Sequence, residues 1–211
     1  MKNIAILALI LICLSPLLAA AADGKDAAQK QLESMKIPYT AASFVAEAGK
    51  GNTKAVELFL AAGMSINSTN GDEGVTPLIA ACNSGQKAVV DLLLSKNADI
   101  NLGDADDTAP LIAASVNGNA DIVSALLTKG AIVNASDVDD KTALMFAAEK
   151  GHPEIVKLLI EKGADIDYSD DDDDTAMTLA KQNKHDDIVA LLQAGKPKQQ
   201  PQSQPQAQTK P

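Results

Sequence analysis

The sequence predicts an all-α solenoid of about five stacked helix–turn–helix repeats, and three of its features lead to this prediction. One pattern recurs along the chain, and its central glycines Gly51, Gly85, Gly118 and Gly151 are separated by 34, 33 and 33 residues. Each copy holds two short apolar segments, one rich in alanine and one rich in leucine. A polar loop, rich in aspartate in the later copies, joins successive copies. Because helical hairpins this short do not fold alone, they bury their apolar faces by stacking on one another.

The composition argues against several classes of function. The 211 residues carry 28 acidic side chains against 18 basic ones, all lysine, for a net charge of −10, and only 2% are aromatic. A nucleic-acid binder is disfavoured because the chain lacks a basic face and stacking aromatics. Two cysteines and two histidines are too few for a disulfide scaffold and unfavourable for a zinc site. The absence of arginine rules out an arginine-dependent site for phosphoryl transfer.

Residues 1–22 are typical of a secretory signal peptide. A lysine precedes an apolar run over residues 4–14, and Ala20 and Ala22 have the spacing of small residues at a cleavage site. The run is too short to span a bilayer, and an uncleaved apolar helix is the alternative interpretation. We therefore expect a bacterial protein that is periplasmic or secreted, without a stable membrane anchor after cleavage. Cleavage would leave Cys82 as the single thiol.

Residues 23–37 are expected to form an N-terminal capping helix. Ala28, Leu32 and Met35 recur every three to four residues, which places them on one face of a helix. Pro38 disfavours helical geometry in the residue before it, so we expect the helix to stop there.

The repeat array is predicted to cover residues 38–195. The first helix of each copy is rich in alanine, which lets neighbouring helices approach closely, and the second carries a stripe of leucines. Pro153 and Glu154 suit the first turn of a second helix, and Lys162 followed by Gly163 suits its end. The five repeats are expected at about residues 38–71, 72–104, 105–137, 138–170 and 171–195.

Residues 196–211 are expected to form an extended, solvated and disordered tail. The segment contains six Gln, four Pro and three Lys but no acidic residue. Such a composition offers no apolar surface to bury. A weak anchor to anionic surfaces or to a partner is the alternative interpretation.

The repeats resemble those of the ankyrin-repeat family. Motifs of that family stand at residues 76–78 (TPL), 151–152 (GH), 155–159 (IVKLL) and 163–167 (GADID). The histidine that follows T-P-L in the family is replaced by Ile79, Ile112, Met145 and Thr178. Glu47 takes a normally small position in the first copy, and Lys184 replaces the central glycine in the last. The resemblance covers about residues 38–195 and implies β-turn fingers between the repeats.

The loops between repeats depart from the family pattern because they carry many aspartates. The acidic positions are Asp104, Asp106, Asp107, Asp137, Asp139, Asp140 and Asp170 to Asp174. Gly74 keeps the family's glycine, whereas Asp107, Asp140 and Asp173 replace it, and we expect these aspartates in the left-handed conformation. Three interpretations of the acidic loops stay open: solubility of an exported protein, docking of a basic protein, and binding of divalent cations. The loops lack the spacing of an EF-hand, which argues against the last interpretation.

The sequence gives little support for catalysis. His152 and His185 follow the mid-repeat turn, where the family places histidine for local hydrogen bonds, and no Cys or carboxylate lies at ligand spacing from them. Cys82 follows two alanines, and we expect it to be buried in the seam between helices. The motifs of serine hydrolases, zinc proteases and phosphate-binding loops do not occur. We therefore expect no enzyme, no cofactor and no metal site.

The resemblance implies a non-catalytic protein–protein interaction module, which we place in the bacterial cell envelope. Family members bind through their finger tips and the first-helix residues of the concave side. Carried over by position, these are Asp106, Thr108, Val116, Asn117, Asp139, Lys141, Glu149, Lys150, Asp171, Asp172 and Asp174. Ile112 and Met145 either add an apolar anchor or pack internally. The expected partner is a protein with a basic surface, bound by a monomer.

Two alternative functions stay open. The chain could serve as an inhibitor or protective subunit of one specific exported enzyme. It could also bind a divalent cation such as Ca²⁺ through its acidic loops.

Overall fold

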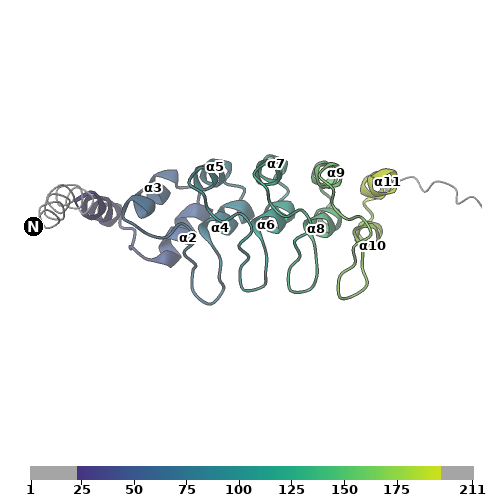
Figure 1. The fold of residues 1–211 in the computed structure, drawn as a ribbon, viewed down its shortest axis with the longest axis horizontal. Helices are drawn as coiled ribbons and strands as arrows, with labels where there is room; N and C mark the ends of the chain where they lie inside the picture. Colours follow the sequence, from purple (N-terminus) through teal and green to yellow (C-terminus); the bar gives the residue numbers. More distant parts are fainter. Residues whose placement is uncertain (1–22, 196–211) are drawn as a thin grey trace, which may run out of the picture.

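Five pairs of helices stacked side by side form the body of this computed structural model, which describes residues 23–195 (Figure 1). The predicted signal peptide and tail lie outside the described residues. The pairs are α2 (Ala41–Gly49) with α3 (Thr53–Ala61), α4 (Pro77–Asn83) with α5 (Lys87–Ser95), α6 (Pro110–Asn117) with α7 (Ala120–Thr128), α8 (Ala143–Lys150) with α9 (Pro153–Glu161), and α10 (Ala176–Gln182) with α11 (Asp186–Gly195). The predicted all-α repeat solenoid is confirmed. Within residues 23–195, no helix is long and apolar enough to cross a membrane.

The helices lie in two layers. The first helices of the pairs, α2, α4, α6, α8 and α10, pack against one another in one layer, and the second helices form the other (Figure 1). The loops that join one pair to the next project in a row from the side of the first helices (Figure 1). Each repeat therefore packs mainly on its sequence neighbours, as in other solenoids.

The two layers differ in side-chain size because they differ in helix spacing. Ala81, Ala114 and Ala147 are fully buried in the first-helix layer, where a small side chain allows close packing. Leu93 and Leu126 are fully buried in the second helices and fill the space beneath the second layer. These residues belong to one continuous apolar core that runs the length of the array.

The ends of the helices follow local signals in the sequence. The Thr76 hydroxyl accepts a hydrogen bond from the backbone N–H of Ile79 and caps the start of α4. Gly118 ends α6 with a φ of 84°, a conformation that glycine adopts without strain. Asn97 and Lys184 adopt the same left-handed region with φ of 61°, although neither is glycine.

A further helix covers residues 23–34 and packs on the first repeat. Ala28 and Leu32 are buried, as their spacing predicts. Met35, the third residue of that spacing, is 38% exposed. The helix ends before Met35, and Lys36 turns the chain with a φ of 58°, so the helical spacing no longer applies there.

Glu47 shows how the first repeat accommodates a charge at a normally small position. Its side chain is buried and accepts hydrogen bonds from Lys50 Nζ and Asn52 Nδ2, both at 2.7 Å. Burial raises the pKa of the carboxyl, but these hydrogen bonds and the Lys50 charge outweigh burial and hold the pKa below its ordinary value.

Candidate partner-binding surface

Four loops between the repeats make up the projecting row. We call them fingers 1 to 4, and their tips are residues 71–75, 104–108, 137–141 and 170–174. The tips of fingers 2 to 4 close through a backbone hydrogen bond from the first residue to the carbonyl of the last. The N···O distances are 3.4 Å in finger 2, 3.1 Å in finger 3 and 2.9 Å in finger 4.

The first aspartate of each of fingers 2 to 4 builds the turn. In finger 4, Asp170 Oδ1 accepts hydrogen bonds from the backbone N–H groups of Asp172 and Asp174, at 3.1 and 2.8 Å. Asp104 and Asp137 make the equivalent pairs of bonds in fingers 2 and 3. These three carboxylates therefore act as internal acceptors, a role that the interpretation as an acidic docking surface did not foresee.

The fourth position of each finger is left-handed, as the alignment with Gly74 predicts. Asp107, Asp140 and Asp173 have φ of 55°, 60° and 59°. Gly74 itself has a φ of 68°, and a Cβ atom there would lie 2.9 Å from the backbone nitrogen of Ala105. Finger 1 therefore needs glycine for both its conformation and its close approach to finger 2.

Backbone hydrogen bonds join each finger to the next. Ala105 N–H donates to the carbonyl of Glu73 at 3.0 Å, and Val138 N–H donates to the carbonyl of Asp106 at 3.1 Å. The N–H of Asp171 donates to the carbonyl of Asp139 at 3.3 Å. This ladder fixes the spacing of the finger tips before any partner binds.

The tips concentrate negative charge at this fixed spacing. Asp106, Asp139, Asp171 and Asp172 are exposed, and the charge of the Asp140 carboxylate raises the pKa of Asp171 from its ordinary value. Acidic side chains at neighbouring tips thus feel one another's charge. A positively charged group placed here would relieve this repulsion.

One carboxylate of the row is buried between two fingers. The Asp170 side chain is 1% exposed, and among residues 23–195 its Oδ2 finds no hydrogen-bond donor. The Nζ of Lys141 in finger 3 lies 3.9 Å from this atom and provides an opposite charge. We read the pair as a link between fingers 3 and 4.

The first helices add residues to the same side of the molecule. Val116 and Asn117 end α6 and are exposed, and Asn117 Nδ2 donates to the carbonyl of Asn83 at 2.9 Å. Glu149 and Lys150 end α8 and form an ion pair at 2.8 Å. These helix ends therefore carry charges of both signs, whereas the exposed charged side chains at the finger tips are all acidic.

The predicted site residues divide into two groups by exposure. Those exposed are Asp106, Val116, Asn117, Asp139, Lys150, Asp171 and Asp172. Those partly buried are Thr108, Lys141, Glu149 and Asp174. All eleven lie in the fingers or at the C-terminal ends of first helices.

The burial of Ile112 and Met145 decides whether they contact a partner or pack internally. Each is 1% exposed and belongs to the apolar core. Both side chains therefore pack internally.

At the finger tips, sequence reasoning missed one large exposed apolar residue and two acids. Val138 in finger 3 is 55% exposed, and it aligns with Ala105 and Asp171 in the neighbouring fingers. Asp72 and Glu73 give finger 1 an acidic tip as well. An alignment of the finger tips alone could have found all three.

The two histidines connect neighbouring repeats. His152 Nε2 lies 3.3 Å from the carbonyl oxygen of Val116, and His185 Nε2 lies 3.1 Å from that of Glu149. Each ring packs against the turn glycine of the preceding repeat, Gly118 or Gly151. The hydrogen bonds therefore join two repeats, whereas the resemblance implied a local bond.

Burial makes the Cys82 thiol a poor nucleophile. Cys82 is fully buried, and burial raises the pKa of its thiol to about 12. In the part of the chain that the structure describes, no group of three His, Cys, Asp or Glu side chains is placed to hold a metal ion.

The sequence was compared with models of known protein families and with curated proteins. A family model described as ankyrin repeats (3 copies) matches the chain three times, over residues 16–104, 39–137 and 111–203. The matches overlap and together span most of the sequence. A search of curated proteins found no match.

Proposed function

The chain belongs to the ankyrin-repeat family of protein–protein interaction modules, and we propose that it binds a basic protein through its acidic fingers and the exposed ends of α6 and α8. The observation that carries the proposal is the backbone ladder between fingers 1 to 4, which holds exposed carboxylates at a fixed spacing. A partner that places Lys or Arg side chains along this ladder removes repulsion already present in the free protein. It also binds a surface that needs little reordering.

The same surface supports binding of modest affinity that depends on salt. Its exposed large apolar residues are Val116, Val138 at the tip of finger 3, and Leu102 and Ile132 in the loops of fingers 2 and 3 outside the tips. The surface carries neither tryptophan nor arginine, the side chains that most often dominate binding energy. Charge therefore contributes mainly to the rate of encounter and to selectivity, and added salt weakens both.

We propose that this binding takes place outside the cytoplasm of a bacterium. Residues 1–22 support this location by their resemblance to a secretory signal peptide. Expression of the full chain in a bacterium, followed by mass spectrometry of the periplasmic fraction, tests the location. A chain that begins at Asp23 agrees with the proposal, and a full-length chain retained in the cytoplasm contradicts it.

The test of the surface compares two variants with equal loss of charge. The finger variant carries Asp106→Asn, Asp139→Asn, Asp171→Asn and Asp172→Asn. The control variant carries Asp26→Asn, Glu33→Gln, Glu57→Gln and Glu154→Gln, all at exposed positions away from the fingers. Both variants and the unchanged chain are used to capture proteins from a periplasmic extract at low and high salt.

We expect the unchanged chain and the control variant to capture the same basic proteins, and the finger variant to lose them. Equal capture by both variants would refute the proposal that the acidic fingers bind the partner. Recovery of one enzyme at equal stoichiometry would point to the role of an inhibitor or protective subunit. Calorimetric titration with Ca²⁺ separates the cation-binding alternative, which requires saturable heat that the finger variant lacks.

A further inference from the structure

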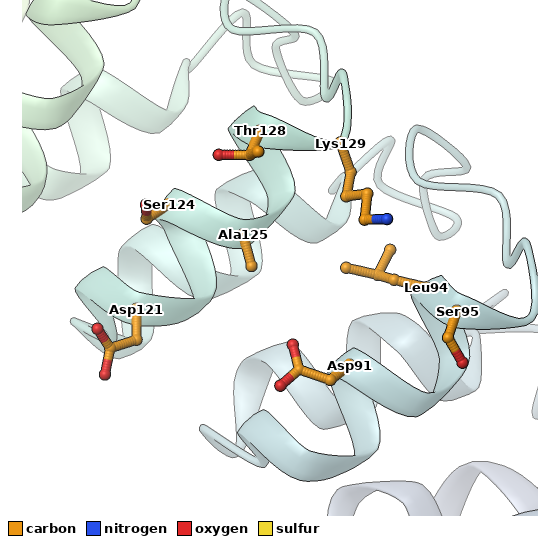
Figure 2. Close-up of a pocket in the computed structure, with 8 residues that line it drawn as sticks. All are labelled: Asp91, Leu94, Ser95, Asp121, Ser124, Ala125, Thr128 and Lys129. Carbon is orange, nitrogen blue, oxygen red and sulfur yellow. The ribbon is translucent and has the colours of Figure 1, made fainter.

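A groove of about 440 Å³ opens between two second helices, α5 and α7 (Figure 2). It lies in the layer away from the fingers (Figure 1). Its lining residues are Asp91, Leu94 and Ser95 from α5, and Asp121, Ser124, Ala125 and Thr128 from α7, with Lys129 directly after α7. None of them belongs to the proposed partner-binding surface.

The groove coincides with a change in side-chain size in one repeat. Ala125 stands where every other repeat has a leucine: Leu58, Leu92, Leu158 and Leu191. In Figure 2 the Ala125 side chain points across the gap toward α5, from which Leu94 points back. Replacement of a leucine by alanine removes three carbon atoms from the wall of this gap. The repeat register thus explains why the hollow lies between α5 and α7.

The rim of the groove carries charges that differ between its two ends. Asp91 and Asp121 lie toward one end, and Lys129 reaches over the other (Figure 2). Both aspartates are exposed, and the only ion pair that either makes in the described residues is that of Asp91 with Lys87, at 2.5 Å. Lys87 balances the charge of Asp91, and Asp121 leaves one negative charge unbalanced at that end.

We propose that this groove is a second docking surface, which takes a basic amphipathic helix from a protein partner. An aliphatic side chain of that helix, of leucine size, packs on Ala125 and Leu94 in place of the missing leucine. A Lys or Arg one helical turn away lies beside Asp91 and Asp121. A helix suits the shape because the gap runs between two side-by-side helices, and side chains of a third helix fit such a gap. The groove and the fingers lie on different layers, so each surface can bind independently of the other.

The experiment fills the groove without disturbing the fold. Ala125→Leu restores the side chain of the other repeats, so we expect this variant to fold with unchanged or higher thermal stability. Ala88→Leu is the matched control, because it adds the same side chain to an exposed position of α5 outside the groove. All baits also carry the finger variant, which removes acidic side chains from the fingers. The probe is a displayed library of short helical peptides.

We expect the selected peptides to carry an aliphatic residue with Lys or Arg three or four residues away. Their affinity should fall about tenfold or more on Ala125→Leu, since burial of one aliphatic side chain is worth at least that factor. Ala88→Leu should leave the affinity unchanged, and Asp91→Asn with Asp121→Asn should weaken it. Peptides that bind Ala125→Leu as tightly as the parent bait would overturn the proposal, as would a failure to enrich any peptide. Neither result bears on the fingers, which are already altered in every bait.

Discussion

Aspartates within a single finger have different roles. Asp170 is buried, and one of its oxygens accepts two backbone hydrogen bonds that shape finger 4. Asp172, two residues later, is exposed. Removal of a buried acceptor leaves its donors unsatisfied, whereas removal of a solvated carboxylate leaves only water to rearrange. The acidic composition of the fingers therefore overstates how much charge they offer to a partner.

Asp170→Ala should lower the free energy of unfolding by about 2–4 kcal/mol. The change leaves the N–H groups of Asp172 and Asp174 without their acceptor and removes the charge that faces Lys141. Urea unfolding followed by circular dichroism measures the loss. Asp172→Ala is the control and should change stability by less than about 0.5 kcal/mol. Similar losses for the two variants would refute the structural role of Asp170.

Cys82 should make the fold sensitive to alkali. Its pKa is about 12 in the folded chain against 9.0 for the free side chain, so the unfolded chain releases its proton first. The contribution of Cys82 to stability is then constant below about pH 9, and it lowers stability as pH rises toward 12, by up to about 1.4 kcal/mol per pH unit. Cys82→Ala should lessen this slope, and alanine fits because Ala48 and Ala148 hold the equivalent position in other repeats. Urea unfolding of the unchanged chain and of Cys82→Ala at pH 8 and about pH 10 tests this prediction. An equal loss of stability with pH in the two proteins would contradict the burial argument.

At the scale of the helical elements, the mid-repeat turn of one repeat supports the next. The turn after α6 ends at Gly118, and the His152 ring from the start of α9 packs on that glycine. The ring nitrogen also reaches the carbonyl oxygen of Val116. Glycine is therefore needed at position 118 for two reasons. It adopts the left-handed conformation without strain, and its lack of a Cβ leaves room for the His152 ring.

Gly118→Ala should destabilise the protein more than Gly130→Ala. Both glycines have positive φ, 84° and 94°, so both substitutions cost about 1 kcal/mol in backbone strain. At Gly118 the new Cβ would also lie 2.6 Å from His152 Cε1, whereas at Gly130 it would meet nothing within 4 Å. We expect a total loss of about 2–3 kcal/mol at Gly118 in thermal or urea unfolding. Equal losses at the two positions would show that the histidine contact contributes nothing.

Much of this architecture could be predicted from the sequence because it depends on local spacing. The regular period gives the helix pairs, and alignment with Gly74 gives the left-handed conformation of Asp107. The inward role of Asp170 could not be predicted, because it depends on which oxygen meets the backbone of a folded turn. The groove beside Ala125 also needed the neighbouring repeat in place, although the change from leucine is visible in the sequence.

At the scale of the whole molecule, the small repulsions between charges on neighbouring fingers sum to a larger destabilisation of the folded state. Two unit charges at about 10 Å repel by only about 0.4 kcal/mol in water, too little to matter for one pair. The fingers are held in line by the ladder, so such pairs recur from finger 1 to finger 4. Within residues 23–195 each repeat packs mainly on its sequence neighbours, so elements from distant repeats do not lie beside the row.

Added salt should therefore raise the melting temperature of the protein. An increase from about 0.01 M to about 0.15 M shortens the screening length from about 30 Å to about 8 Å, which weakens repulsion between neighbouring fingers. The finger variant should show a smaller rise, because it removes charges from the row itself. The control variant loses the same net charge from scattered positions and should keep most of the rise. Differential scanning calorimetry gives these values directly. An equal reduction in both variants would mean that the total charge, and not its alignment along the fingers, sets the response to salt.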